Sequence, residues 1–70
     1  MKIHYYPETD TLSIELKSGV SDRTEEVSED VTIDFDATGQ VLSLDIDLAS
    51  EKVDLGSIEI VGLLERLAVV

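Results

Sequence analysis

Residues 31–48 read VTIDFDATGQVLSLDIDL, and this stretch decides the fold class. Its apolar residues fall at every second position on both sides of a turn at residues 36–39: Val31, Ile33, Phe35, Leu42, Leu44, Ile46 and Leu48. Strict alternation puts such side chains on one face of a strand. Gly39 closes the turn and supplies the positive φ that a tight hairpin needs. The stretch therefore predicts an antiparallel hairpin with one apolar and one polar face.

A second hairpin is predicted upstream of it. Residues 1–6 and residues 11–17 both alternate, with Ile3, Leu12 and Ile14 among the inward positions. The residues between them, Pro7-Glu8-Thr9-Asp10, are typical of a turn. Residues 24–28 predict a short strand at a sheet edge, because their charges discourage further pairing. We therefore expect an antiparallel β-meander of four to five strands, built from two hairpins.

The last part of the chain is ambiguous. Four residues have the spacing of an amphipathic helix, with Ser57 as its N-cap: Ile60, Leu63, Leu64 and Leu67. Residues 57–60 also alternate like a strand, and Gly62 disfavours a helix interior. Because a one-faced sheet needs a cover, we favour a short C-terminal helix on the apolar face. The prediction is an α+β domain over residues 1–70, with the meander in 1–48 and a helical or irregular tail in 49–70.

Composition narrows the classes of function. The chain has 70 residues, sixteen acidic and five basic, a net charge of −11 and no cysteine. Disulfides and thiolate metal sites are excluded. The charge disfavours nucleic acid and anionic membranes, whose binding needs Lys and Arg, and favours encounter with a basic protein. A chain this short buries only about 60% of its unfolded surface. We therefore expect a homodimer or higher homo-oligomer.

The absence of long apolar segments indicates the cellular compartment. It has no apolar stretch of signal-peptide length at its start and no run long enough to span a membrane. The sequence therefore predicts a cytoplasmic protein that is not held in a membrane.

The candidate site is a set of carboxylates on the polar face of the predicted sheet: Glu15, Asp34, Asp45 and Asp47. Asp34 and Asp45 lie on adjacent strands and are expected to be neighbours, with a mutual repulsion of up to about 1 kcal/mol. Three interpretations are open. The face is a solvated surface that keeps the protein soluble. Alternatively, all four carboxylates bind a basic partner, or Asp34, Asp45 and Asp47 bind a divalent cation.

No residue pattern identifies catalysis or a bound cofactor. His4, the single histidine, is expected at the surface, although an acid–base pair with Asp10 or Glu8 is conceivable. Residues 34–39 superficially resemble a calcium loop, but the loop has no glutamate at its twelfth position. The four glycines are dispersed and form no phosphate-binding loop. We therefore expect a protein that is not an enzyme and that uses no cofactor.

Five stretches of the chain resemble a small prokaryotic family, the domain of unknown function number 2283: residues 2–14, 24–27, 31–42, 44–46 and 49–50. The resemblance covers residues 2–52. The family commonly has Asp where Tyr6 stands and Tyr where Ser13 stands. The resemblance implies a β-rich core and a cytoplasmic prokaryotic setting, and it implies no activity and no catalytic residues. Some family members are encoded beside small toxin-like proteins, which would suit an acidic partner protein.

These observations predict an acidic protein-interaction module that neutralises a basic protein partner, in the manner of an antitoxin. The alternatives are a divalent-cation or small-ligand site on the acidic sheet face, and a structural homo-oligomeric domain without catalytic activity.

Overall fold

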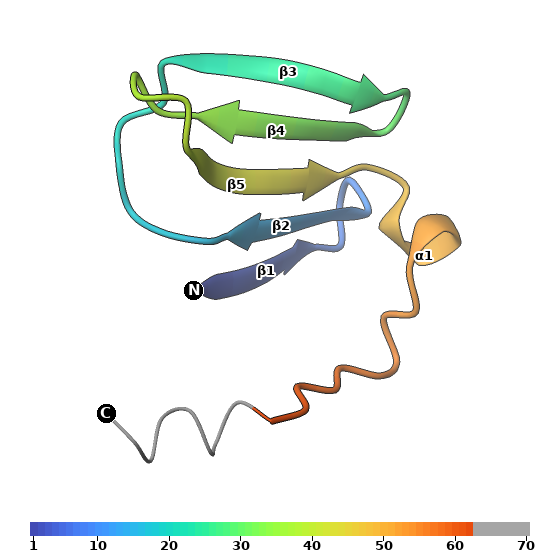
Figure 1. The fold of residues 1–70 in the computed structure, drawn as a ribbon. Coiled ribbons are helices and arrows are strands. Elements are labelled where there is room, and N and C mark those ends of the chain that lie inside the picture. Colours follow the sequence, from blue (N-terminus) through green and yellow to red (C-terminus); the bar gives the residue numbers. More distant parts are fainter. Residues whose placement is uncertain (63–70) are drawn as a thin grey trace.

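The computed structural model describes residues 1–62, which form a five-stranded antiparallel sheet followed by a short helix (Figure 1). The elements are β1 (Lys2–Tyr6), β2 (Thr11–Glu15), β3 (Arg23–Ser28), β4 (Val31–Phe35), β5 (Val41–Ile46) and α1 (Ala49–Lys52). The alternation of apolar and polar residues located β1, β2, β4 and β5, and the short strand expected at residues 24–28 corresponds to β3. Both predicted hairpins are present as β1–β2 and β4–β5.

The order of strands across the sheet is β1-β2-β5-β4-β3, so the prediction of a sequential meander was wrong. In a sequential meander β3 would lie between β2 and β4. Its residues Arg23 and Glu25, which pair with Phe35 and Ile33, would then lie in the middle of the apolar face. Placing β3 at the edge leaves these charges in solvent and brings β5 between β2 and β4. The expectation that residues 24–28 form an edge strand is therefore confirmed.

One face of the sheet is apolar across four strands, and we call it the apolar face. It is formed by alternate residues that the strand register places together: Ile3, Tyr5, Leu12, Ile14, Val31, Ile33, Leu44 and Ile46. Ile46 pairs with Leu12 on one side and with Val31 on the other. Within residues 1–62, the buried apolar side chains are Leu42, Ile46 and Ala49. The centre of the core thus lies along β5.

The connection from β2 to β3 crosses one end of the sheet and packs against β5. The backbone N–H groups of Leu16 and Lys17 both donate to the Leu42 carbonyl, at 2.8 and 3.3 Å. Leu42 is the extra residue where the pairing of β4 with β5 shifts register, and it is only 5% exposed. A Cβ on Gly19 would lie 2.7 Å from a Leu42 methyl, so glycine allows the connection to approach this closely.

Asp10 joins the β1–β2 turn to α1 at the other end of the sheet. Its carbonyl accepts the Ala49 N–H at 2.9 Å. Its carboxylate accepts the Ser50 N–H at 3.0 Å, the Ser50 hydroxyl at 2.6 Å and the Tyr5 hydroxyl at 2.8 Å. Lys52 adds an ion pair to Asp30 at 3.2 Å. Ala49 is completely buried by this arrangement, which we call the Asp10 junction.

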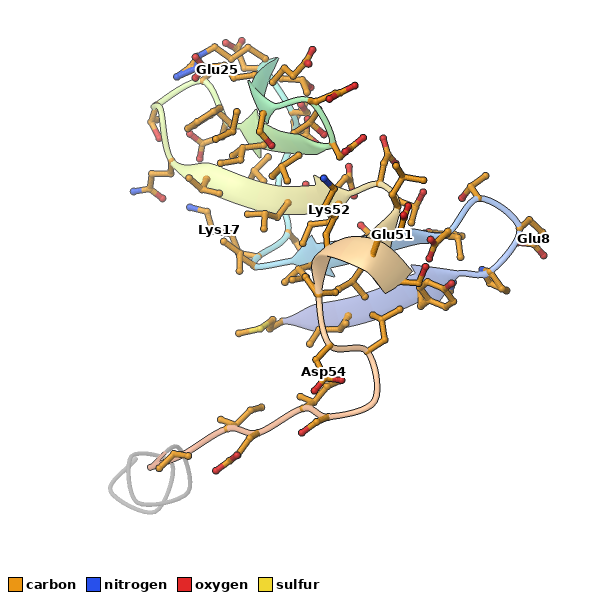
Figure 2. All side chains as sticks on the ribbon, turned by 90° about the vertical axis from the view of Figure 1, so that its right-hand side faces the viewer. Glu8, Lys17, Glu25, Glu51, Lys52 and Asp54 are labelled. Carbon is orange, nitrogen blue, oxygen red and sulfur yellow. The ribbon has the colours of Figure 1, made fainter. Side chains whose placement is uncertain are left out.

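The described helix lies earlier than the one predicted from the apolar spacing. Residues 57–62 are not helical, and Gly62 has a φ of +82°, which a helix interior does not allow. Leu63, Leu64 and Leu67 lie outside the described residues. After α1, the chain passes beyond β1 and away from the sheet (Figures 1 and 2), and Ile58 is 71% exposed there. Residues 53–62 therefore do not cover the apolar face.

Truncating the side chain of Ile46 should destabilise the fold, because both hairpins pack against this residue. Ile46→Ala is expected to lower the free energy of unfolding by about 2 to 4 kcal/mol, because it removes buried methyl groups from the strand that both hairpins share. Val20→Ala, at a position that is 86% exposed, is the control and should change it by less than about 0.5 kcal/mol. Urea denaturation followed by circular dichroism measures both. Equal losses in the two variants would contradict a core centred on β5.

Candidate functional site

The polar face of the sheet contains a hollow of about 370 Å³, which we call the acidic hollow. It lies over β2, β5 and β4 and is bordered by the connection from β2 to β3. Its lining is Ser13, Glu15, Lys17, Ser18, Gly19, Ser21, Asp34, Leu42, Ser43 and Asp45. Three of the four carboxylates predicted from the sequence, Glu15, Asp34 and Asp45, therefore line one hollow. Each comes from a different strand.

The strand register spaces these carboxylates apart with hydroxyl groups. Ser43 lies opposite both Glu15 and Asp34. Asp45 lies opposite Ser13 on one side and Thr32 on the other. Asp34 and Asp45 are thus diagonal neighbours, at a typical separation of roughly 7 to 8 Å, rather than directly opposed. This alternation of acid and hydroxyl reduces the repulsion expected between the carboxylates.

The hydroxyl groups also hold Asp34 in place. Ser43 donates its hydroxyl proton to one Asp34 oxygen at 3.0 Å, and Thr24 donates to the other. In residues 1–62 the ion pairs join Lys17 to Asp36, Arg23 to Glu25 and Lys52 to Asp30. None of these pairs involves a carboxylate of the acidic hollow. Lys17 lines the rim of the hollow, but its ammonium group is directed to Asp36 and Gln40. The hollow consequently keeps a net negative charge, because its three carboxylates outnumber Lys17 at the rim and Lys2, which lies opposite Glu15 in the strand pairing.

The fourth predicted carboxylate, Asp47, lies away from the hollow, beyond the end of β5. Thr11 donates its hydroxyl proton to Asp47 at 3.0 Å, and the Asp47 N–H donates to the Asp30 carbonyl at 2.8 Å. His4 is also apart from the hollow and packs on Tyr6, with 4.2 Å between the ring centroids. No group of three His, Cys, Asp or Glu residues in the described chain is placed to hold a metal ion. The structure thus brings Asp34 and Asp45 together without Asp47.

Asp36 serves the turn between β4 and β5. One of its carboxylate oxygens accepts the Thr38 N–H at 2.9 Å, the Thr38 hydroxyl at 2.6 Å and the Gln40 N–H at 2.9 Å. The Thr38 hydroxyl bond, followed by the Gln40 N–H bond, lowers the pKa of Asp36 from 3.8 to about 2. Because this carboxylate already stabilises a hairpin turn, residues 34–39 act as a turn and not as a calcium loop.

Two features of the site were not predicted from the sequence. The first is the set of hydroxyl groups between the carboxylates, which could have been found as the other polar positions of the same alternating strands. The second is the Asp10 junction, since Asp10 was interpreted as a turn residue and as a conceivable partner of His4, whereas its carboxylate is bonded to Tyr5 and Ser50. The hydrogen bonds from Ser50 and Tyr5 lower the pKa of Asp10, and the bond to Asp10 raises the pKa of Tyr5. No signal in the sequence pairs Asp10 with Ser50.

The fold and the hollow define a class of small, acidic, one-sheet proteins with a short helix after the last strand. A family model described as a protein of unknown function (DUF2283) matches residues 2–50, and the chain belongs to this family. The match covers all five strands and the start of α1. No curated protein and no solved structure shows significant similarity to the chain. No helix among residues 1–62 has the length and apolar character needed to cross a bilayer.

The stabilising role of Asp36 should appear in the dependence of stability on pH. A carboxyl with a lowered folded-state pKa stabilises the fold above its ordinary pKa of 3.8, and this contribution disappears as the pH falls through about 2. Asp36→Asn should therefore lower the urea midpoint at pH 7, and the difference from the wild type should shrink between about pH 4 and pH 2. Glu8→Gln, at an exposed turn residue, serves as the charge-matched control. If the urea midpoint of Asp36→Asn lies below that of the wild type by the same amount at every pH from 7 to 2, the carboxylate does not have this role.

Proposed function

We propose that this protein is a small binding module whose acidic hollow receives a basic side chain of a partner protein. The observation that carries the proposal is the convergence of Glu15, Asp34 and Asp45, from three adjacent strands, in one hollow with no ion-pair partner among the described residues. Such a site attracts cations and gives them a defined position, which a diffusely charged surface does not do.

The spacing of the acidic groups favours an organic cation. A calcium ion needs six to eight oxygens at about 2.3 to 2.6 Å from one point. Diagonal neighbours at roughly 7 to 8 Å are too widely separated to converge on one ion without rearrangement. An arginine guanidinium carries five donors in a planar fork, so it can bridge carboxylates and hydroxyls that lie several ångströms apart. A hollow of about 370 Å³ also has the size of a typical site for a small group.

The contacts of the hollow favour binding over catalysis. Proton transfer by a carboxyl group is promoted by an apolar surround, whereas Asp34 here accepts two hydroxyl hydrogen bonds. His4 packs on Tyr6 and does not line the hollow. We therefore interpret the chain as a binding protein and not as an enzyme.

In the cell, this binding would act by masking the basic surface of another protein, in the manner of an antitoxin. A chain with a net charge of −11 reaches a basic partner quickly, because long-range attraction raises the association rate. Covering lysines and arginines that bind a phosphate backbone would block that activity without any chemical step. The proposed compartment is the cytoplasm.

A titration with a hexa-arginine peptide at about 0.15 M salt tests the hollow directly, since salt at this level screens distant charges. The double variant Asp34→Asn, Asp45→Asn removes two charges from the hollow. It is expected to bind the peptide at least tenfold more weakly, which corresponds to about 1.4 kcal/mol. The matched control is Glu8→Gln, Glu51→Gln, which removes the same charge at the β1–β2 turn and on α1 (Figure 2). Isothermal titration calorimetry measures all three affinities, and the control should stay within about twofold of the wild type.

Equal weakening in the two double variants would show attraction to net charge alone and would refute a site at the hollow. Capture from the native host then tests the biological partner. A basic protein should be retained by the wild type and lost with the hollow variant, while the control double variant should retain it. Retention of no basic protein by the wild type would count against the proposed function.

A further inference from the structure

We infer that the apolar face of the sheet is the interface of a homodimer, in which the same face of a second copy covers it. The inference is independent of the proposed function, because the acidic hollow lies on the opposite face. It rests on the openness of the apolar face, on the distribution of charge around it and on the path of the chain after α1.

The face is open in the described structure. Ile3 and Tyr5, on the outer strand β1, are 44% and 39% exposed, and the central residues Ile14, Ile33 and Leu44 are only partly buried. Contiguous exposed apolar surface of this kind typically marks an interaction site. Within residues 1–62, Ala49 at the start of α1 is completely buried, whereas these residues of the apolar face remain accessible to solvent.

The distribution of charge allows a second copy to be the occupant despite the high net charge. Two chains that each carry −11 repel one another wherever their acidic surfaces meet. On β1, β2, β4 and β5, however, every position of the apolar face is uncharged, and the acids of these strands lie on the polar face. On the outer strand β3, Glu25 pairs with Ile33 and so lies on the same side of the sheet as the apolar face. Its carboxylate forms an ion pair with Arg23 at 3.2 Å. Contact through this face therefore keeps the acids of both copies directed outward.

The size of the face is comparable with that of a small interface. The four strands that carry the apolar positions, of five to six residues each, present roughly 350 Å² in plan at the usual strand spacing and rise. Side-chain relief makes the accessible area larger than this plan area, and a standard stable interface buries roughly 800 Å² on each partner. Two such faces would pack as a sandwich with a separation of about 10 Å.

The described part of the tail is not the cover. After α1, residues 53–62 run past the β1 edge of the sheet and away from it (Figures 1 and 2). Ile60 and Val61 are 62% and 83% exposed in this segment. A symmetric pair of sheets would also leave both acidic hollows facing outward. The dimer would then present two equivalent binding sites on opposite surfaces.

The mass of the full-length protein in solution tests the inference. Light scattering coupled to size-exclusion chromatography should give twice the mass of one chain at about 100 µM. Ile3→Glu places a charge on the face at an exposed position and should raise the dimer dissociation constant at least tenfold. Val20→Glu makes the same change of charge in the β2–β3 connection, where Val20 is 86% exposed, and should leave the constant unchanged within twofold.

A second measurement needs no variant. In a sample that mixes isotope-labelled and unlabelled chains, filtered nuclear Overhauser spectra should show contacts between copies from the methyl groups of Ile3, Ile14 and Leu44. A wild-type mass of one chain would overturn the inference. A dimer without these intermolecular contacts, or one equally stable in Ile3→Glu, would place the interface elsewhere and would also overturn it.

Discussion

The pairing of β5 with two strands at once organises the molecule. Leu44 lies between Ile14 and Ile33, and Ile46 lies between Leu12 and Val31, so the hydrophobic contacts of the two hairpins meet on one strand. The chain has no cysteine with which to supplement this small core. Because β5 occupies the centre, β3 is left at the edge beside β4. The connection from β2 to β3 packs on Leu42 near the start of β5, and the Asp10 junction holds α1, which follows the end of β5.

The same arrangement gives the polar face its character. A sheet fixes the direction of every side chain, so the carboxylates of β2, β4 and β5 cannot move apart as they would on a loop. They are held on a common surface, and the serine and threonine hydroxyls between them make this arrangement tolerable. The backbone hydrogen bonds of the sheet therefore offset the electrostatic repulsion between these carboxylates. This is what distinguishes the acidic hollow from the exposed acids of the turns, such as Glu8.

Local patterns predicted much of the structure, and contacts distant in sequence account for the rest. Alternation at Val31, Ile33 and Phe35 and at their counterparts was enough to locate four of the strands, and the charges of residues 24–28 indicated an edge strand. The order of the strands was not predictable in this way, because it depends on which strand pairs with β2. Among the candidate residues, Glu15, Asp34 and Asp45 were correctly grouped on one face, whereas Asp47 was not separated from them. Its position beyond the end of β5 depends on Thr11 and Asp30, which are distant in the sequence.

The crossing connection between β2 and β3 has a consequence for how the chain folds. The unit β3–β4–β5 closes through two short turns and the β1–β2 hairpin through one, so each can form from neighbouring residues. Joining them requires Leu12 to pair with Ile46 across about half of the chain, and such non-local pairing is intrinsically slow. Until it occurs, one edge of β5 remains unpaired. The β1–β2 hairpin of another molecule could occupy that edge equally well, which makes exchange of this hairpin between chains the characteristic misfolding route of this topology.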